Sequence, residues 1–147
     1  MAYTFSHPAN LPADKVAFIS AFYETSDSRN VDRYLDFLTR DVDFIMGVNG
    51  VKGEAAVRKI RETMWGGVET RSHRPEKAYL GDDAANEVML HGTVSYGLKN
   101  GDSVDNVGWA ARMVFAPGTE LKLSRYQVWL DGAPLGTALK KQAEQQQ

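Results

Sequence analysis

FLTRDVDFIMGVNGVKG, residues 37–53, places the end of one helix, a strand and the start of another helix in a single short segment. Residues 42–46 are short and β-prone, because valine, phenylalanine and isoleucine suit a pleated, half-buried surface. Gly47, Gly50 and Gly53 surround this run and predict a tight return of the chain. We therefore expect a strand that leads through a glycine turn directly into a helix.

The residues before this stretch predict two helices. Val16, Ile19 and Tyr23 form one apolar stripe of a helix that spans residues 11–25, and the stripe is widened by Phe18 and Phe22. Asn30 can cap a second helix, because a side-chain oxygen at that position accepts from a free backbone N–H. The second helix has its buried side at Tyr34, Leu35, Phe37 and Leu38. The two helices form a hairpin, with Asp27 at the bend.

A third helix follows Gly53 and ends at Gly66-Gly67. Val57, Ile60 and Met64 repeat at helical spacing and form its apolar side. We interpret the charged run on this helix as mostly a solvated face; it consists of Arg58, Lys59, Arg61 and Glu62.

From residue 69 onward the apolar period changes to two, which is typical of strands. Four long segments are predicted, at residues 71–80, 87–98, 104–115 and 121–130. Turn signals separate them, and the strongest is Asn100-Gly101, a frequent β-hairpin turn. In the second segment one side is apolar, and it carries Val88, Leu90, Val94 and Tyr96. The fold class is α+β, with three N-terminal helices on a strongly curved, largely antiparallel sheet that encloses a pocket.

Composition limits the class of protein. We expect one domain over residues 1–147, with a loose arm at 1–10 and a flexible tail at 134–147 that is a frayed helix or disordered. A net charge of −2 argues against nucleic acid as a partner. The absence of cysteine excludes disulfides. With neither a signal peptide nor a membrane-length apolar run, we predict a cytoplasmic protein with no membrane partner.

No metal or cofactor is predicted. The histidines and acidic residues show no metal-ligand spacing. The glycine-rich stretches match neither the dinucleotide fingerprint nor the phosphate loop, and no serine lies in a nucleophile elbow. Any activity is therefore expected to be free of cofactors.

Four motifs, in this order and spacing, resemble the SnoaL-like branch of the NTF2-like superfamily. They are DVDFIMGVNGVKGEAAV (41–57), RSH (71–73), VGWAARMVF (107–115) and YQVWLDGAP (126–134). The resemblance implies a cone in which a bent sheet wraps around the helices and leaves a mostly apolar pocket.

A narrower similarity links SDSRNVDR, residues 26–33, to the scytalone dehydratase family. It implies that Asp27 and His73 correspond to the aspartate and histidine of that family's pocket. The sequence departs from the family pattern where Ser26 replaces a tyrosine and Met46 lies near the place of a second one. The second catalytic histidine has no clear counterpart, because the matching strand end reads Tyr96-Gly97-Leu98. Scytalone itself is therefore not the expected substrate.

We predict a catalytic pair in which Asp27 hydrogen-bonds one ring nitrogen of His73 and orients the imidazole as a base. The alternative is that Asp27 caps the second helix and His73 only packs against it. Arg71 lies two residues from His73 on the same strand face, where it either binds an anionic substrate group or pairs with Glu69 or Glu76. The full set of expected substrate-binding residues is Tyr23, Met46, Trp65, Arg71, Tyr96 and Trp109.

The expected function is that of a cofactor-independent lyase, cyclase or isomerase acting on a small hydrophobic oxygenated metabolite, such as a polyketide or terpenoid intermediate. The alternative is a non-catalytic binding or dimeric interaction module with the same fold. We also expect a homodimer through the outward face of the long strands, to cover apolar side chains at Met113, Phe115, Val128 and Trp129.

Overall fold

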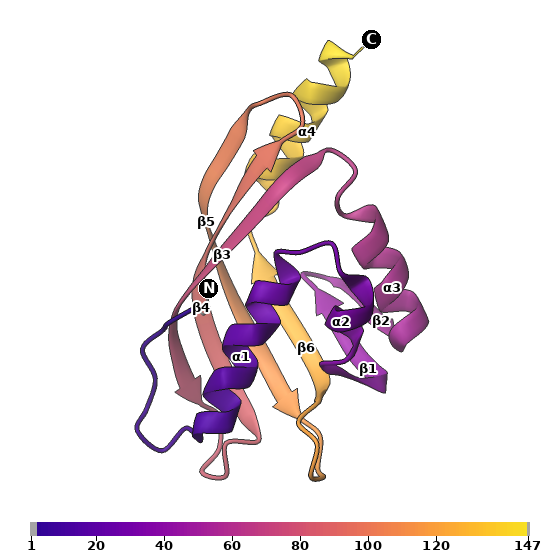
Figure 1. The fold of residues 1–147 in the computed structure, drawn as a ribbon. Coiled ribbons are helices and arrows are strands. Elements are labelled where there is room, and N and C mark those ends of the chain that lie inside the picture. Colours follow the sequence, from indigo (N-terminus) through magenta and orange to yellow (C-terminus); the bar gives the residue numbers. More distant parts are fainter. Residues whose placement is uncertain (1–2, 147) are drawn as a thin grey trace.

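Six strands form one curved, mixed sheet, and four helices accompany it (Figure 1). The computed structural model describes residues 3–146. The strand order is β2-β1-β6-β5-β4-β3; β1 and β6 are parallel and the other neighbours are antiparallel. The helices are α1 (Ala13–Ser26), α2 (Val31–Leu35), α3 (Glu54–Thr63) and α4 (Ala133–Gln145). The strands are β1 (Leu38–Met46), β2 (Asn49–Lys52), β3 (Val68–Leu80), β4 (Glu87–Leu98), β5 (Ser103–Phe115) and β6 (Leu123–Leu130).

The predicted α+β class and curved sheet are confirmed, and the four long strands lie close to their expected bounds. The second helix is shorter than expected, because Leu38 already belongs to β1 and pairs with Leu123 of β6. β2 was not foreseen. It forms a short hairpin with β1 across Gly47, whose φ of +61° favours glycine.

Two local sequence features determine where the helices α2 and α3 begin. The Asn30 side chain accepts a hydrogen bond from the backbone N–H of Arg33, at 3.1 Å, and so caps α2 as predicted. Gly53 precedes α3 with a φ of +91°, and a Cβ there would lie 3.4 Å from the carbonyl oxygen of Arg40. This glycine therefore lets the chain turn sharply from the β1–β2 hairpin into α3.

The core lies between the sheet and the helices. β4 buries every second residue, and α1 contributes Ile19, Phe22 and Tyr23. The predicted dimer interface contains Met113, Phe115, Val128 and Trp129 on the outer face of the sheet. The first three of these residues are buried in the core instead. Only Trp129 is exposed, at 43%. Alternation along a strand places Val128 and Trp129 on opposite faces, which sequence alone did not assign.

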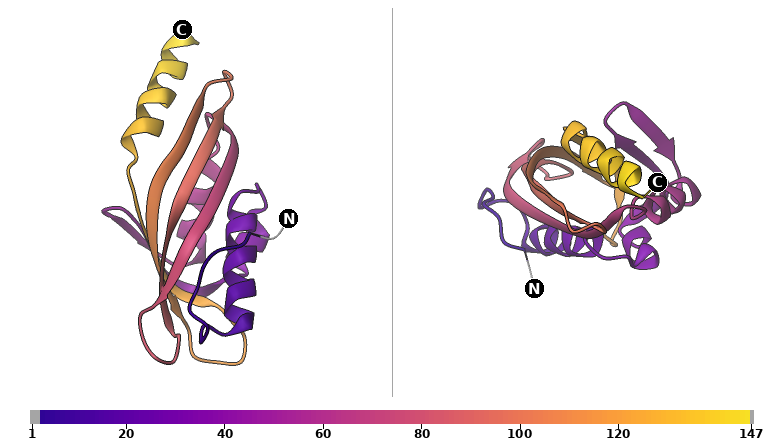
Figure 2. Two further views of the ribbon diagram at one scale, coloured as in Figure 1. Left: turned by 90° about the vertical axis from the view of Figure 1, so that its left-hand side faces the viewer. Right: turned by 90° about the horizontal axis from the view of Figure 1, so that it is seen from above.

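Described residues near both ends of the chain contact the rest of the fold. Ser6 exchanges backbone hydrogen bonds with Glu76 and Ala78, each at 2.9 Å, so the expected loose arm covers the edge strand β3 over its described part. Residues 1 and 2 of that arm lie outside the described residues. The C-terminal segment forms α4, at the end of the sheet where β4 turns into β5 (Figure 2). Gln142 of α4 is buried and hydrogen-bonds Gly67 and Asn100.

None of the helices in residues 3–146 is long and apolar enough to cross a membrane.

Candidate functional site

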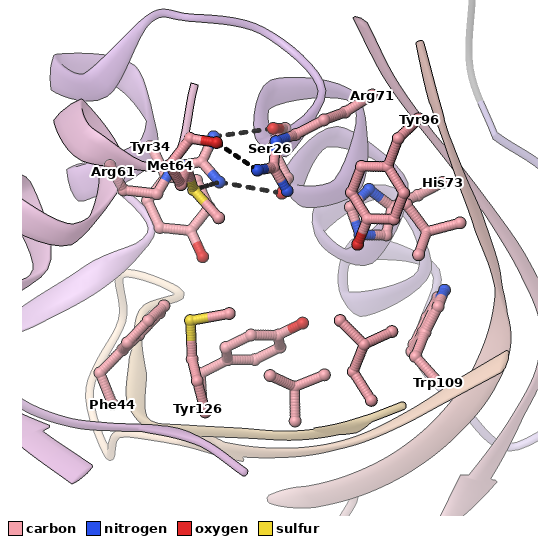
Figure 3. Close-up of a pocket in the computed structure, with 14 residues that line it drawn as sticks. Ser26, Tyr34, Phe44, Arg61, Met64, Arg71, His73, Tyr96, Trp109 and Tyr126 are labelled. Carbon is pink, nitrogen blue, oxygen red and sulfur yellow. Dashed lines mark hydrogen bonds between the residues drawn. The ribbon is translucent and has the colours of Figure 1, made fainter. Parts of the chain in front are cut away.

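A narrow cavity lies between the inner face of the sheet and the N-terminal helices (Figure 3). Its volume is about 50 Å³. The cavity is therefore small compared with the roughly 300–1,000 Å³ of typical ligand pockets. Its lining residues are Ser26, Tyr34, Phe44, Met46, Arg61, Met64, Arg71, His73, Val94, Tyr96, Trp109, Tyr126, Val128 and Leu130.

Asp27 and His73 are joined by two hydrogen bonds. The distance between Nδ1 of His73 and Oδ1 of Asp27 is 2.5 Å, and the backbone N–H of His73 donates to Oδ2 at 2.8 Å. The Tyr3 hydroxyl donates to the same Oδ2. Both side chains of the pair are largely buried, with exposed fractions of 15% for His73 and 9% for Asp27. The carboxylate thus holds the imidazole in one orientation.

The free nitrogen of His73 is available to the cavity. Nε2 makes no hydrogen bond to any described residue, and the ring is part of the cavity lining. Asp27 directly follows α1, and Asn30 rather than Asp27 caps α2. The capping alternative for Asp27 is therefore wrong, and the carboxylate instead holds the imidazole with Nε2 free of hydrogen bonds to the described residues.

Aromatic rings surround the imidazole. The ring centroid of His73 lies 5.2 Å from that of Tyr23 and 5.8 Å from that of Trp109. Tyr23 and Trp109 stack on each other at 4.8 Å. These contacts limit rotation of the His73 ring and keep water away from one side of it.

Two arginines bring positive charge to the cavity. Arg61 is 3% exposed and donates through Nη2 to the carbonyl oxygen of Ser26, at 2.7 Å. Arg71 donates through Nη2 to the carbonyl oxygen of Met64, at 2.5 Å. Burial lowers the pKa of Arg71, and the charge of Arg61 lowers it further, while Tyr96 and Asp27 raise it. The solvated face predicted for α3 is thus wrong at Arg61.

Phenol groups also reach the cavity, although the two family tyrosine positions hold other residues. Tyr34, Tyr96 and Tyr126 line it, and the hydroxyls of Tyr126 and Tyr23 are 3.1 Å apart. Burial raises the pKa of Tyr126 to about 12 and also raises the pKa of Tyr34 and of Tyr96. All three phenols are therefore protonated at neutral pH and can donate a hydrogen bond to a ligand.

The expected substrate-binding residues divide into two groups. Met46, Arg71, Tyr96 and Trp109 line the cavity together with His73. Tyr23 and Trp65 lie behind the lining. The hydroxyl of Tyr23 is engaged by Tyr126, and the indole of Trp65 packs beneath Arg71 at 5.1 Å. Both support the wall without forming it.

Sequence reasoning missed Arg61, Tyr34 and Tyr126 as lining residues. A signal existed for Arg61, since it lies four residues after the buried Val57 and therefore on the same helix face. The sequence pattern indicates only a buried helix position for Tyr34 and a strand position for Tyr126. Which way their hydroxyls point depends on neighbouring elements that are distant in sequence.

A strongly curved sheet with helices across its inner face and a cavity between them is an NTF2-like fold. The chain belongs to the SnoaL-like domain family, whose profile matches residues 19–119. A comparison with curated proteins found no significant match.

Solved structures share the fold at low identity. A putative SnoaL-like polyketide cyclase from Jannaschia sp. CCS1 is 13% identical, with a TM-score of 0.71, and the match covers 89% of this chain and 94% of that one. ActVI-ORFA from Streptomyces coelicolor is 17% identical, with a TM-score of 0.68 and coverage of 84% and 97%. TerC, which was co-crystallised with polyporic acid, is 15% identical, with a TM-score of 0.69 and coverage of 85% and 97%.

Proposed function

We propose that this protein is a cofactor-independent enzyme of the cyclase, isomerase or dehydratase type, with His73 as the general base. The observation that carries the proposal is the hydrogen-bonded Asp27–His73 pair, in which His73 lines the cavity and its Nε2 has no hydrogen-bond partner among the described residues. A neutral imidazole held by a carboxylate is suited to removing a proton from carbon next to a carbonyl. Membership of the SnoaL-like domain family, and the fold shared with a putative SnoaL-like polyketide cyclase, support this chemistry.

The proposed reaction begins when Nε2 of His73 takes the proton from a C–H bond beside a carbonyl group. The electron pair of that bond moves to the carbonyl oxygen and forms an enolate. The protonated imidazole then returns the proton to another carbon, to a departing hydroxyl group as water, or to the oxygen of a second carbonyl that the enolate has attacked. These outcomes are isomerisation, dehydration and aldol ring closure, and all three are redox-neutral.

The rest of the cavity would stabilise and orient the enolate. Arg71 lies two residues from His73 on the same face of β3, so its charge is directed to the same space as the base. The protonated phenol of Tyr96 is a second donor. Preorganised donors of this kind typically contribute about 10²–10³ in rate. The apolar walls favour a small hydrophobic oxygenated substrate, such as a polyketide or terpenoid intermediate.

The test is proton exchange at a model ketone. We expect the protein to catalyse deuterium incorporation into 2-tetralone in D₂O, followed by NMR, and His73→Ala to reduce the rate by about 10²-fold or more. His91→Ala is the matched control, because the His91 side chain is 43% exposed and its ring nitrogens contact Tyr79 and Glu76 among the described residues. Equal exchange in the unaltered protein and His73→Ala, at similar melting temperatures, would contradict the proposal.

The alternative is a small-molecule-binding module without catalysis. A thermal-shift screen against polyketides and steroids, combined with mass analysis of the recovered ligands, distinguishes the two. Binding without conversion of any ligand would favour the module. We further propose a cytoplasmic location and a homodimer, and the dimer is tested below.

A further inference from the structure

The two cavity arginines lack a dedicated counter-ion. No ion pair joins Arg61 or Arg71 to a carboxylate among residues 3–146, and Arg61 is almost fully buried. Asp27 is the carboxylate whose charge reaches Arg71, but its oxygens are occupied by His73 and Tyr3. Two neighbouring guanidinium charges therefore share a water-poor space, which is costly unless an anion compensates them.

Neutral groups hold both arginines in place. The guanidinium of Arg61 lies over the ring of Tyr34 at 4.2 Å, and that of Arg71 lies 5.1 Å from the ring of Trp65 and 5.2 Å from that of Tyr96. Backbone carbonyl oxygens accept one or two further hydrogen bonds from each. These contacts fix the positions of the guanidinium groups without neutralising their charge.

Both arginines also retain unused donors. The Nε atoms of Arg61 and Arg71 are buried and have no hydrogen-bond partner within the described part of the chain. Buried donors of a charged group are nearly always satisfied in folded proteins. Each Nε has almost no accessible surface, so an anion that accepts from the guanidinium fork in two places would have to displace the side chains that cover it.

We infer that the cavity binds a planar organic oxyanion, either a carboxylate or the enolate of an acidic 1,3-dicarbonyl, on Arg61 and Arg71. Apolar walls at Phe44, Val94 and Val128 favour an organic anion over an inorganic one. The inference deepens the proposed function, since an anion held on Arg71 would direct its neighbouring C–H toward His73. The binding itself does not require that His73 be catalytic.

The experiment measures binding through tryptophan fluorescence, because Trp109 lines the cavity and Trp65 supports Arg71. The probes at pH 7 are benzoate, the enolate of 1,3-cyclohexanedione, neutral benzyl alcohol and inorganic phosphate. We expect at least one of the organic anions to bind about tenfold or more tightly than benzyl alcohol. Tighter binding of benzoate would indicate a carboxylate ligand, and tighter binding of the 1,3-cyclohexanedione enolate would indicate an enolate ligand. Equal affinity for benzyl alcohol, or tighter binding of phosphate, would overturn the inference.

Substitutions of the arginines test whether these side chains bind the anion. Arg71→Gln should remove the preference for the anion, a loss of roughly ten- to a hundredfold. Arg74→Gln is the matched control, because Arg74 is an exposed arginine on the same strand. Arg61→Lys keeps the charge in case a neutral residue there prevents folding, and it should weaken binding by losing the planar fork. Equal effects of Arg71→Gln and Arg74→Gln would refute the assignment.

Different results would refute the proposed function and the anion-binding inference. His73→Ala should keep the affinity for the anion while losing exchange activity, so binding is measured independently of turnover. Loss of anion preference in a protein that still shows His73-dependent exchange would refute only the inference.

Discussion

At the scale of single residues, three hydrogen bonds converge on the carboxylate of Asp27. It accepts from the ring and the backbone N–H of His73 and from the hydroxyl of Tyr3. Tyr3 belongs to the N-terminal arm and lies outside the helices and strands that form the cavity. Its hydroxyl nevertheless stabilises the Asp27 carboxylate, which orients His73. Burial raises the pKa of the Tyr3 phenol, and its hydrogen bond to Asp27 raises it further, which keeps it a donor.

Removing the Tyr3 hydroxyl, which donates to Asp27, should destabilise the protein. For Tyr3→Phe we expect a loss of about 1–2 kcal/mol in the free energy of unfolding, because a hydrogen bond to a charged, partly buried group is removed. Urea denaturation measures it. The control is Tyr79→Phe, whose hydroxyl contacts only the exposed His91, at 3.1 Å. That variant should change the free energy by less than about 0.5 kcal/mol. Similar losses in both variants would show that Tyr3 has no special role.

At the scale of elements, the pairing of β3 with β4 determines where His73 lies. The pairing register shifts between Pro75 and Lys77, beside Gly92 of β4. A Cβ on Gly92 would lie 2.2 Å from the carbonyl oxygen of Arg74 and 2.9 Å from the indole of Trp109. The absence of a side chain at Gly92 thus lets β3 approach β4 and Trp109 closely, next to the Asp27–His73 pair.

Replacing Gly92 by alanine adds one methyl group and tests how closely β3 approaches β4. Gly92→Ala should cost about 1–3 kcal/mol, because the backbone of β3 must move to relieve the overlap. Chemical denaturation measures the loss. Gly108→Ala on the adjoining strand β5 is the control, since a Cβ there has no neighbour within 4 Å. A Gly92→Ala variant as stable as Gly108→Ala would contradict the close approach of the strands.

At the scale of the whole molecule, the sheet directs most of its large apolar residues inward. Trp129 and Tyr79 are each 43% exposed and come from different strands, β6 and β3. The homodimer proposal therefore depends on Trp129 and its neighbours on β5 and β6 rather than on a broad apolar face. A tryptophan buries about 150–250 Å², so the remainder of a stable interface would have to be more polar.

We expect the unaltered protein to be a dimer at micromolar concentration and Trp129→Ser to be a monomer, as measured by light scattering. Trp129 would act as the central buried aromatic of the interface. Tyr79→Ser is the control and should remain dimeric, because it removes an equally exposed aromatic on the edge strand β3, three strands away from β6. A monomeric unaltered protein would contradict the proposal.

Local patterns in the sequence determined the elements of this protein. Helical spacing predicted α1 and α3, the period of two predicted β3 to β6, and Asn30 and Gly53 predicted the starts of α2 and α3. These features depend on neighbours a few residues away, so they can be read along the chain. The pairing of Asp27 with His73 was reached through the family resemblance, since the two residues are distant in sequence.

Only the tertiary structure decided which side chains share the cavity. Arg61, Tyr34 and Tyr126 come from α3, α2 and β6, and no local pattern shows that they meet His73 in one space. The inward position of Met113, Phe115 and Val128 and the attachment of both chain ends likewise depend on how the sheet curves and which strands pair. The physical reason is that strand register and sheet curvature arise from contacts between distant segments, and a shift of one residue would turn every side chain of a strand to the other face.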